Sequence, residues 1–389
     1  MDIEIMVLDP TFWLSLAVLI VTAIVLTEVA LGAQRIGQLR LILPVLGPNP
    51  PKVSVIVPAL NEADTIEPAL RSLLALHYPN LEIIAINDRS TDATPAILER
   101  MAREHPQLRV LHIAALPDGW LGKNHALSRG AAIAGGDYLL FTDADVVFEP
   151  SALTRAVNYC EQHGVDHLTL LFDVVVKTQL LRMLVLSFSV NFMARFKPWK
   201  VATSPRHFLG AGGFNLVRAD AYRAMGGHGA IPLAVLDDMM LGKRIKAAGY
   251  RQHVLFGREL VGVEWYRSAR DMINGMQKNI FAAFDFQLGQ LIAVTAAMLL
   301  LRVWPWIGLV VTEGVTRWIN AATVLIGLLL FAGMLHIAGW GYRCLVFAPV
   351  ISLLELAIWW RGSLTALLRG GIEWRGTRYA LDTLRRHQD

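Results

Sequence analysis

Between Lys52 and Trp265, short apolar runs alternate with longer amphipathic segments. A buried parallel strand reads as a short, nearly continuous apolar run, whereas a helix on a sheet repeats apolar residues every three or four positions. The pattern predicts strands at 53–57, 81–86, 110–113 and 138–141, and helices near 65–76, 92–104 and 123–134. This alternation favours an α/β fold with a Rossmann-like, mainly parallel sheet.

Two of the predicted helices carry start signals. Asp64 followed by Glu67 is typical of a capping arrangement, and Thr94 before Pro95 places a proline in a first helical turn. Ligands of such sheets bind at the carboxyl ends of the strands. We therefore expect one edge of the sheet to gather the segments that follow the strands, at 58–62, 87–88 and 143–145.

Apolar segments flank the α/β region on both sides. Residues 12–33 contain one acidic residue, Glu28, and no Lys or Arg. As a helix, this segment is long enough to cross a hydrocarbon core of about 30 Å. No small-residue cleavage site follows, so we expect a retained anchor rather than a cleaved signal peptide. Three more apolar segments follow the α/β region, at 291–311, 319–337 and 344–360.

Charge predicts the orientation of these segments. Acidic residues precede the first one and basic residues follow it, so the positive-inside rule puts the α/β region in the cytosol. Three further crossings would carry the arginine-rich tail outside, which the same rule opposes. We expect one late segment not to cross. Arg302 weakens the assignment of 291–311 as a transmembrane helix, and Glu355 weakens that of 344–360.

Composition limits the partners. The chain of 389 residues has a net charge of +4 without a Lys/Arg block or interleaved aromatic residues, which favours an anionic membrane face and argues against nucleic acid. Its two cysteines, Cys160 and Cys344, lie too far apart for a metal motif or a disulfide framework. A reducing compartment and a multi-pass protein of the cell (inner) membrane are expected.

Asp143-Ala144-Asp145 follows the predicted strand at 138–141. In an extended strand, residues i and i+2 project to the same face, so the carboxylates of Asp143 and Asp145 could share one hard cation. Mg²⁺ or Mn²⁺ would then retain positions for water and substrate phosphates. The alternative is that both aspartates only shape a turn or a helix cap.

Four motifs follow one another along the α/β region: Val-Ile-Val-Pro-Ala-Leu-Asn-Glu at 55–62, Ile-Asn-Asp-Arg-Ser-Thr-Asp at 86–92, Gly-Trp-Leu-Gly-Lys-Asn-His-Ala at 119–126 and Thr-Asp-Ala-Asp at 142–145. In this order and spacing they resemble a family 2 glycosyltransferase of the GT-A fold. The resemblance covers about residues 52–280, and the third motif looks most like the membrane-bound branch with carotenoid-acid and hopanoid-associated enzymes.

The resemblance implies a role for each matching position. Asp145 would hold the metal, Asp143 would contact the ribose or the metal's water, and Lys123 would approach the base or diphosphate. The remaining nucleotide-sugar contacts would come from Pro58, Ala59, Glu62, Asp88 and Ala144. The competing interpretation is that these polar residues cap helices, shape turns or point into solvent. Asn87 stands where the family usually has an Asp, and the second member of that pair, Asp88, is retained.

The glycine-rich stretch 210–215 precedes Asp237-Asp238, which open an amphipathic helix. This spacing resembles the family's acceptor strand and acidic pair, in which the second carboxylate is the general base. The resemblance therefore implies a catalytic pair, with Asp238 taking the proton of the acceptor hydroxyl in an inverting reaction. Alternatively, the pair only favours the helix dipole, which is worth about 0.3–1 kcal/mol.

Later segments bear on the acceptor. Processive members carry Gln-x-x-Arg-Trp after the base, whereas this chain has Met276-Gln277-Lys278-Asn279-Ile280-Phe281, so transfer of one sugar per acceptor is expected. Residues 267–287 look like an amphipathic membrane-surface helix. Residues 180–196 could be an interfacial ramp for the acceptor or a core helix, and the sequence leaves both open.

The expected organisation is an anchor at 1–40, a GT-A domain at 52–265, an interfacial helix at 266–287, transmembrane helices at 288–362 and a basic cytosolic tail at 363–389. The expected function is inverting, metal-dependent sugar transfer, with a UDP-sugar as donor by family habit, to a lipid acceptor at the cytosolic membrane face. Two alternatives remain: a polyprenyl-phosphate sugar transferase, and a scaffold or transporter with a degenerate nucleotide fold.

Overall fold

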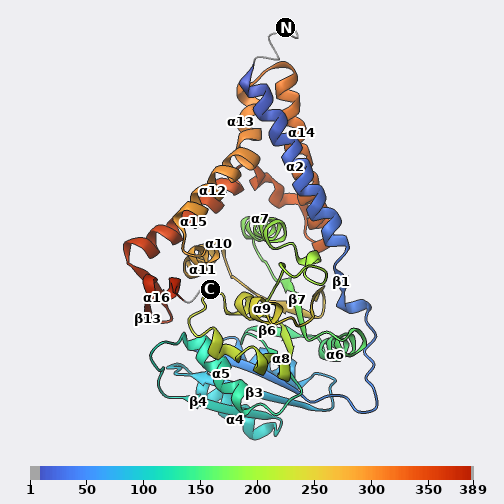
Figure 1. Cartoon of the computed structure of the whole chain (residues 1–389), viewed down its shortest axis with the longest axis vertical. Coiled ribbons are helices and arrows are strands. Elements are labelled where there is room, and N and C mark those ends of the chain that lie inside the picture. The colour runs from blue at the N-terminus through green and yellow to red at the C-terminus, as the bar shows by residue number, and fades with distance from the viewer. Residues whose placement is uncertain (1–8, 387–389) are drawn as a thin grey trace. The chain divides into compact units, whose positions relative to one another are not determined.

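The computed structural model describes residues 9–386, which form two compact units (Figure 1). The α/β unit comprises residues 35–175 and 198–265, and the helical unit comprises residues up to Gln34 together with 176–197 and 266–385. Residues 176–197, which lie inside the predicted domain at 52–265, thus group with the apolar helices.

The α/β unit is built on an eight-stranded sheet in the order β1-β10-β7-β9-β5-β2-β3-β4. All its strands are parallel except β9, which pairs antiparallel with β5 and β7. This confirms the predicted α/β fold with a mainly parallel sheet. The strands are β1 (Gly37–Gln38), β2 (Val53–Ala59), β3 (Leu81–Asp88), β4 (Leu108–Ile113), β5 (Tyr138–Phe141), β7 (His167–Leu171), β9 (Asn215–Arg218) and β10 (Gln252–Phe256).

A smaller sheet has the order β6-β11-β8. In it β11 (Val261–Val263) pairs antiparallel with β6 (Val146–Phe148) and parallel with β8 (Asp173–Val174). Three short 3₁₀ helices complete the unit: η1 (Leu39–Leu41), η2 (Pro198–Lys200) and η3 (Gly227–Ala230).

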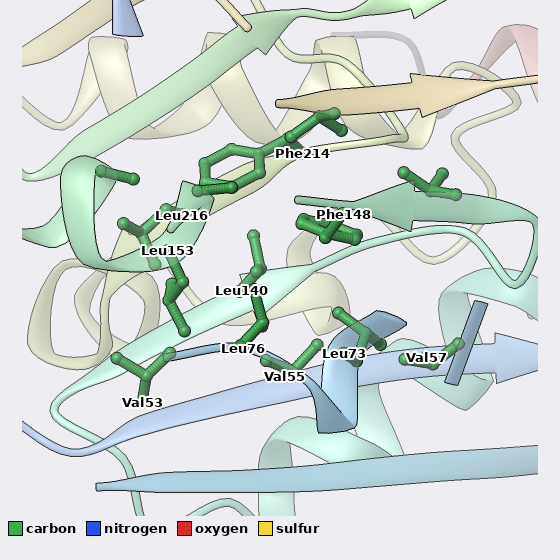
Figure 2. Close-up of a cluster of buried hydrophobic side chains, with 14 of the residues drawn as sticks. Val53, Val55, Val57, Leu73, Leu76, Leu140, Phe148, Leu153, Phe214 and Leu216 are labelled. Carbon is green, nitrogen blue, oxygen red and sulfur yellow. The ribbon is translucent and has the colours of Figure 1, made fainter. Parts of the chain in front are cut away.

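Alternating side chains of the strands feed two separate cores, because successive residues of a strand point to opposite faces. In β2, Val55 belongs to one core (Figure 2) and Ile56 to the other. The first core is covered by α3 (Ile66–Leu74), α4 (Thr94–Glu104) and α6 (Ala152–His163). The second is covered by α5 (Gly122–Ile133), α8 (Ala219–Ala224) and α9 (Asp237–Ala247).

The helix start signals had mixed outcomes. Pro95 does lie in the first turn of α4. The capping arrangement predicted at Asp64 is wrong, because α3 is preceded by Thr65 and has no side-chain cap. Glu67 pairs instead with Arg71 of its own helix at 2.6 Å and with Arg100 of α4 at 2.5 Å, so its carboxylate is occupied by two arginines.

The helical unit contains long apolar helices and a small carboxyl-terminal hairpin. Its longer elements are α2 (Pro10–Gln34), α7 (Gln179–Phe196), α12 (Leu288–Met298), a π-helical turn (Leu299–Val303), α13 (Trp304–Val311), α14 (Gly314–Ala338) and α15 (Ala348–Leu368). Its shorter elements are α10 (Ala269–Gly275), α11 (Gln277–Ala283), η5 (Tyr342–Phe347), β12 (Gly371–Trp374), β13 (Thr377–Ala380) and α16 (Leu381–Arg385).

The segment predicted as one amphipathic helix at 266–287 is two helices, α10 and α11, which meet at Met276. Gly275, just before the junction, packs so closely on the ring of Tyr266 that a Cβ there would lie 2.5 Å from it. The predicted apolar stripe is largely buried inside the unit, at Met272, Met276, Ile280 and Phe284. A packed position therefore replaces the free surface helix that periodicity alone indicated.

Among residues 9–386, four helical spans are long and apolar enough to cross a membrane: Pro10–Gln34, Leu288–Val311, Gly314–Ala338 and Tyr342–Leu368. In the helical unit, α2 packs on α14, α7 and α13, whereas α15 packs on α11, α7 and the π-helical turn. Ser15 contributes to the packing of α2, because its Oγ accepts hydrogen bonds from Trp304 Nε1 at 3.1 Å and Asn320 Nδ2 at 3.0 Å.

The two charges that weakened the predicted spans lie opposite each other. Arg302 Nη1 is 3.5 Å from Glu355 Oε2. Ser187 and Asn191 of α7 accept hydrogen bonds from the Arg302 guanidinium at 2.8 and 3.0 Å, and Ser187 donates to Glu355 at 2.7 Å. Pairing of this kind is how ionisable groups are accommodated inside apolar helix bundles.

Gly130 tests how α5 is seated on the sheet. A Cβ there would lie 2.7 Å from Ile56 Cγ2 and 2.8 Å from Ile86 Cδ1. We expect Gly130→Val to destabilise the α/β unit by about 1–3 kcal/mol through overpacking, measured as a lower melting temperature. Gly229→Val is the matched control, because nothing lies within 4 Å of a Cβ at Gly229; equal melting temperatures for the two variants would contradict this seating.

His228 tests the acid sensitivity of the second core. Burial, with a smaller contribution from the charge of Lys123, lowers its pKa to about 3. The unfolded chain then binds a proton below about pH 6.5 that the native protein does not, so stability falls as the pH drops from there. Between pH 7 and pH 5 the free energy of unfolding should decrease by about 2 kcal/mol less in His228→Phe than in the unsubstituted protein. Denaturant unfolding at each pH measures this difference. An unchanged slope in His228→Phe would refute the assignment.

Candidate active site

The loops that follow β2 and β3 are tied together at the carboxyl edge of the sheet. The amide of Asn61 donates to Ser90 Oγ at 3.0 Å, and Asn61 Oδ1 accepts from the amide of Thr91 at 2.8 Å. The amide of Glu62 donates to Thr94 Oγ1 at 2.9 Å. The first two predicted segments, 58–62 and 87–88, are therefore neighbours in space as the topology required.

Asp88 lies against the first turn of α5. Its carboxylate accepts two hydrogen bonds from Arg89, at 2.7 and 2.9 Å. A Cβ on Gly122 would lie 2.6 Å from Asp88 Oδ2 and 2.7 Å from Arg89 Nη2. Glycine at 122 thus allows this ion pair to sit beside the helix that carries Lys123.

Asn87 is engaged within the protein. Its Nδ2 is 3.0 Å from His112 Nδ1, and its Oδ1 accepts from the amide of Ser90 at 3.1 Å. The side-chain amide of Asn87 thereby shapes the loop that follows Asp88. These two contacts explain why a polar residue suits position 87.

Lys123 joins two of the predicted acidic motifs. Its Nζ lies 2.8 Å from Asp143 Oδ1 and 3.2 Å from Asp237 Oδ2. Burial alone would lower the pKa of this ammonium, but the carboxylates of Asp143, Asp237 and Asp238 outweigh burial and raise it. Lys123 is therefore a permanent cation at the centre of the acidic cluster.

The Asp143-Ala144-Asp145 stretch is a turn, because β5 ends at Phe141 and the next strand begins at Val146. The prediction that strand alternation aligns the two carboxylates is therefore wrong. Burial, followed by the nearby charges of Asp143 and Glu62, raises the pKa of Asp145 to about 7. The turn concentrates negative charge at one point, as the metal hypothesis needs, by a route other than pleating.

Asp238 is held by backbone amides on both carboxylate oxygens. Oδ2 accepts from Gly212 at 2.8 Å and Oδ1 accepts from Met239 at 2.7 Å. Burial and then the charge of Asp237 raise its pKa to about 7, against the opposing effect of Lys123. Burial likewise raises the pKa of Asp237. A carboxylate with a pKa near the working pH is well suited to general-base catalysis.

The loop 209–213, which we call the glycine loop, brings the motifs together. The carbonyl of Gly212 accepts from the amide of Asp143 at 3.1 Å, and the carbonyl of Gly213 accepts from Thr142 Oγ1 at 2.9 Å. A Cβ on Gly212 would lie 2.6 Å from Asp143 Oδ2, and one on Gly210 would overlap the backbone of Asp238. These glycines are needed for close approach.

A small pocket lies where these elements meet. It is lined by Lys123, Leu127, Phe141, Thr142, Asp143, Gly212, Asn215, His228, Asp237, Asp238 and Leu241. Sequence reasoning missed the contributions of His228 and Asn215, because no local motif distinguishes them from other polar residues near a turn or strand.

The predicted site residues thus divide into three groups. Lys123, Asp143, Asp237 and Asp238 line one pocket. Asp88, Asp145 and Glu62 lie at the same edge of the sheet but do not border it. Ala59 and Ala144 are buried in the first core and Pro58 is half-buried in β2, which leaves mainly backbone groups of the two alanines for ligand contact.

The donor set suits a hard divalent cation. Among residues 9–386, no group of three or more His, Cys, Asp or Glu side chains is arranged to hold a metal. Mg²⁺ and Mn²⁺ sites that bind substrate phosphates use one or two protein carboxylates and fill the remaining positions with water and phosphate. Asp143 and Asp145 supply that number of carboxylates, and they lie close enough for the charge of Asp143 to act on Asp145.

Comparisons with known proteins agree with this geometry. Residues 54–226 match the family model for glycosyl transferase family 2. Over 105 residues the chain is 37% identical to a probable glycosyltransferase, YdaM, of Bacillus subtilis, which covers 26% of this chain and 25% of that protein. Over 111 residues it is 37% identical to a beta-monoglucosyldiacylglycerol synthase of Synechocystis sp., which covers 28% of this chain and 23% of that protein.

Among solved structures, the chain resembles the mannosyltransferase PcManGT from Pyrobaculum calidifontis, determined in complex with GDP-Man and Mn²⁺. The TM-score is 0.52 at 20% identity, over 91% of this chain and 99% of that one. The two curated relatives are matched over only about a quarter of their own length, so these likenesses define a domain and a fold. Residues 54–226 of the α/β region thus match glycosyl transferase family 2, and the chain shares a GT-A-like α/β fold with the solved mannosyltransferase.

Proposed function

We propose that this protein transfers one sugar from a nucleotide-sugar donor, a UDP-sugar as the first candidate, to a lipid acceptor at the cytosolic face of the cell membrane. The observation that carries the proposal is the pocket where Lys123, Asp143, Asp237 and Asp238 meet at the carboxyl edge of the sheet. This is the edge at which α/β folds bind nucleotides.

Asp238 is the general base in this proposal. It takes the proton of the acceptor hydroxyl while that oxygen attacks the anomeric carbon from the side opposite the diphosphate. The bond between the anomeric carbon and the diphosphate oxygen breaks, the nucleoside diphosphate leaves, and the anomeric configuration inverts without a covalent enzyme intermediate. The two amide hydrogen bonds to Asp238 support this role, because they fix the carboxylate orientation before substrate binds.

The donor binds along the edge formed by β2, β3 and β5. Pro58, Glu62 and Asp88 would contact the nucleoside, and Ala59 and Ala144 would contribute backbone groups. Lys123 would offer a cation to the diphosphate. Asp143 and Asp145 would hold Mg²⁺ or Mn²⁺, which when bound stabilises the charge that develops on the leaving diphosphate. The Mn²⁺ and GDP-Man bound to the structural neighbour support a metal and a nucleotide sugar for this fold.

Two observations support a lipid acceptor and a membrane location. Four spans have the length and composition of membrane-crossing helices, and a relative in the same family is named as a synthase of glucosyldiacylglycerol. The positive-inside rule favours a basic tail that stays cytosolic, and this requires that one late segment does not cross.

The direct experiment incubates membranes containing the protein with Mn²⁺ and labelled UDP-glucose, UDP-galactose or GDP-mannose, followed by mass analysis of the lipid extract. A glycolipid carrying one added sugar is the expected product. Label on polyprenyl phosphate would replace the acceptor proposed here with the alternative one. Absence of both labelled lipid and metal-dependent donor hydrolysis would favour the scaffold or transporter interpretation.

Asp238→Asn tests the base. We expect turnover to fall by about 100-fold or more, within the range for a lost general base, while UDP binding in the presence of Mn²⁺ stays within about threefold, because the amide keeps the size of the side chain. Transfer is measured with the labelled donor and binding by calorimetry. Full turnover in this variant would show that another group accepts the proton.

Asp145→Asn tests the metal. We expect UDP affinity in Mn²⁺ to fall about tenfold, because a ligating carboxylate is lost, and UDP affinity in EDTA to stay unchanged. Calorimetric titrations with and without Mn²⁺ give both values. The assignment fails if the variant and the unsubstituted protein respond equally to Mn²⁺.

A further inference from the structure

Three fully buried polar residues lie beneath the glycine loop: His167 on β7, Asn215 on β9 and Gln252 on β10. Each is at most 2% exposed. Polar side chains of this kind are costly to bury unless every hydrogen-bonding group finds a partner. Their partners therefore indicate what they are for.

The three side chains form a continuous hydrogen-bonded chain. Gln252 Nε2 lies 2.6 Å from His167 Nδ1, and His167 Nε2 lies 3.1 Å from Asn215 Oδ1. Because the amide of Gln252 can only donate through Nε2 and Asn215 Oδ1 can only accept, His167 must be neutral with its proton on Nε2. Burial lowers the pKa of His167 to about 4, against the effect of the hydrogen bond that His167 donates to Asn215, so this form persists at neutral pH.

Both ends of the chain hold the backbone of the glycine loop. Gln252 Oε1 accepts from the amide of Leu209 at 3.0 Å. Asn215 fixes both sides of Ala211, because Oδ1 accepts from its amide at 3.2 Å and Nδ2 donates to its carbonyl at 2.9 Å. The loop is thus secured at two positions that flank Gly210.

The far side of the same loop holds the reactive carboxylate. The amide of Gly212, the residue after Ala211, donates to Asp238 Oδ2 at 2.8 Å. The backbone of Gly210 lies against the backbone of Asp238, and a Cβ on Gly242 would lie 2.2 Å from the carbonyl of Leu209. A shift of the glycine loop would therefore move Asp238 or break its hydrogen bond.

We propose that Gln252, His167 and Asn215 act together as positioning residues, which hold the glycine loop and through it the Asp238 carboxylate in the orientation that accepts the acceptor's proton. The inference rests on the proposed function for the role of Asp238. Gln252 and His167 do not line the pocket, so their effect is on turnover rather than on donor binding.

Gln252→Glu gives a readout that a loss of stability alone would not produce. Glu keeps the acceptor for Leu209 but replaces the Nε2 donor that faces both His167 Nδ1 and the carbonyl of Gly242. The bond to His167 can therefore re-form only when the pair of Glu and His167 takes up one proton. The groups that face His167 from β9 and β10 are the neutral amides of Asn215 and Gln252. In the variant the new carboxylate therefore favours the imidazolium, and protonation restores the chain.

We expect Gln252→Glu to lower kcat at least tenfold at pH 8 with donor KM within threefold, and to recover part of that loss at pH 6. Gln252→Met, which is close in size and lacks the hydrogen bonds to Leu209, His167 and Gly242, should lose a similar factor at every pH. Ser54→Ala is the matched control, because Ser54 is also fully buried and hydrogen-bonded, to Glu82 at 2.5 Å and to the Gly136 amide at 2.8 Å. Ser54 lies at the amino end of β2, whereas the glycine loop lies at the carboxyl edge of the sheet. It should keep kcat and its pH profile.

Hydrogen exchange separates this inference from the proposed function. In Gln252→Met the amides of Gly210 to Gly213 should exchange at least tenfold faster than in the unsubstituted protein, and in Ser54→Ala they should not. If no donor is turned over by the unsubstituted protein, the proposed function fails and the exchange rates still decide the positioning role. The inference would be overturned if the exchange rates in Gln252→Met equalled those of the unsubstituted protein. It would also be overturned if Gln252→Glu kept the kcat and pH profile of the unsubstituted protein.

Discussion

The site depends on the ammonium group of Lys123, which lies within ion-pair distance of both Asp143 and Asp237. Placing several carboxylates in a partly desolvated space costs several kcal/mol per charge unless a counter-charge is fixed beside them. The position of that ammonium follows from α5, which Gly122 and Gly130 allow to lie close to Asp88 and to the sheet. Two small residues on one helix thus determine where the acidic cluster can form.

The acidic groups lie far apart along the sequence, and the folded backbone brings them together. The turn after β5 supplies Asp143, and the first turn of α9 supplies Asp237 and Asp238. The glycine loop touches both, through the amide of Asp143 and the carboxylate of Asp238. Because its contacts are main-chain groups at short range, side chains at Gly210 and Gly212 are excluded for steric reasons.

Much of the architecture could be predicted from local pattern. The strands β2 to β5 and the helices α3 to α5 were expected within a few residues of their observed bounds, because apolar periodicity reports directly on which face is buried. The turn at Asp143 was not predicted, since a strand pattern does not reveal where pairing stops. The chain through His167 was also beyond reach: His167 and Gln252 are 85 residues apart, and no periodic signal connects them.

The insertion of α7 between β8 and the glycine loop has a practical consequence. Cutting the chain before Lys52 and after Trp265 would leave a fragment that still carries residues 179–196 but lacks α2, α14 and α15, which pack on this helix. Buried residues of α7 such as Leu184, Leu186 and Val190 would then lose part of their cover, and exposed apolar patches of this kind favour aggregation. The α/β unit is therefore best studied with its apolar helices attached.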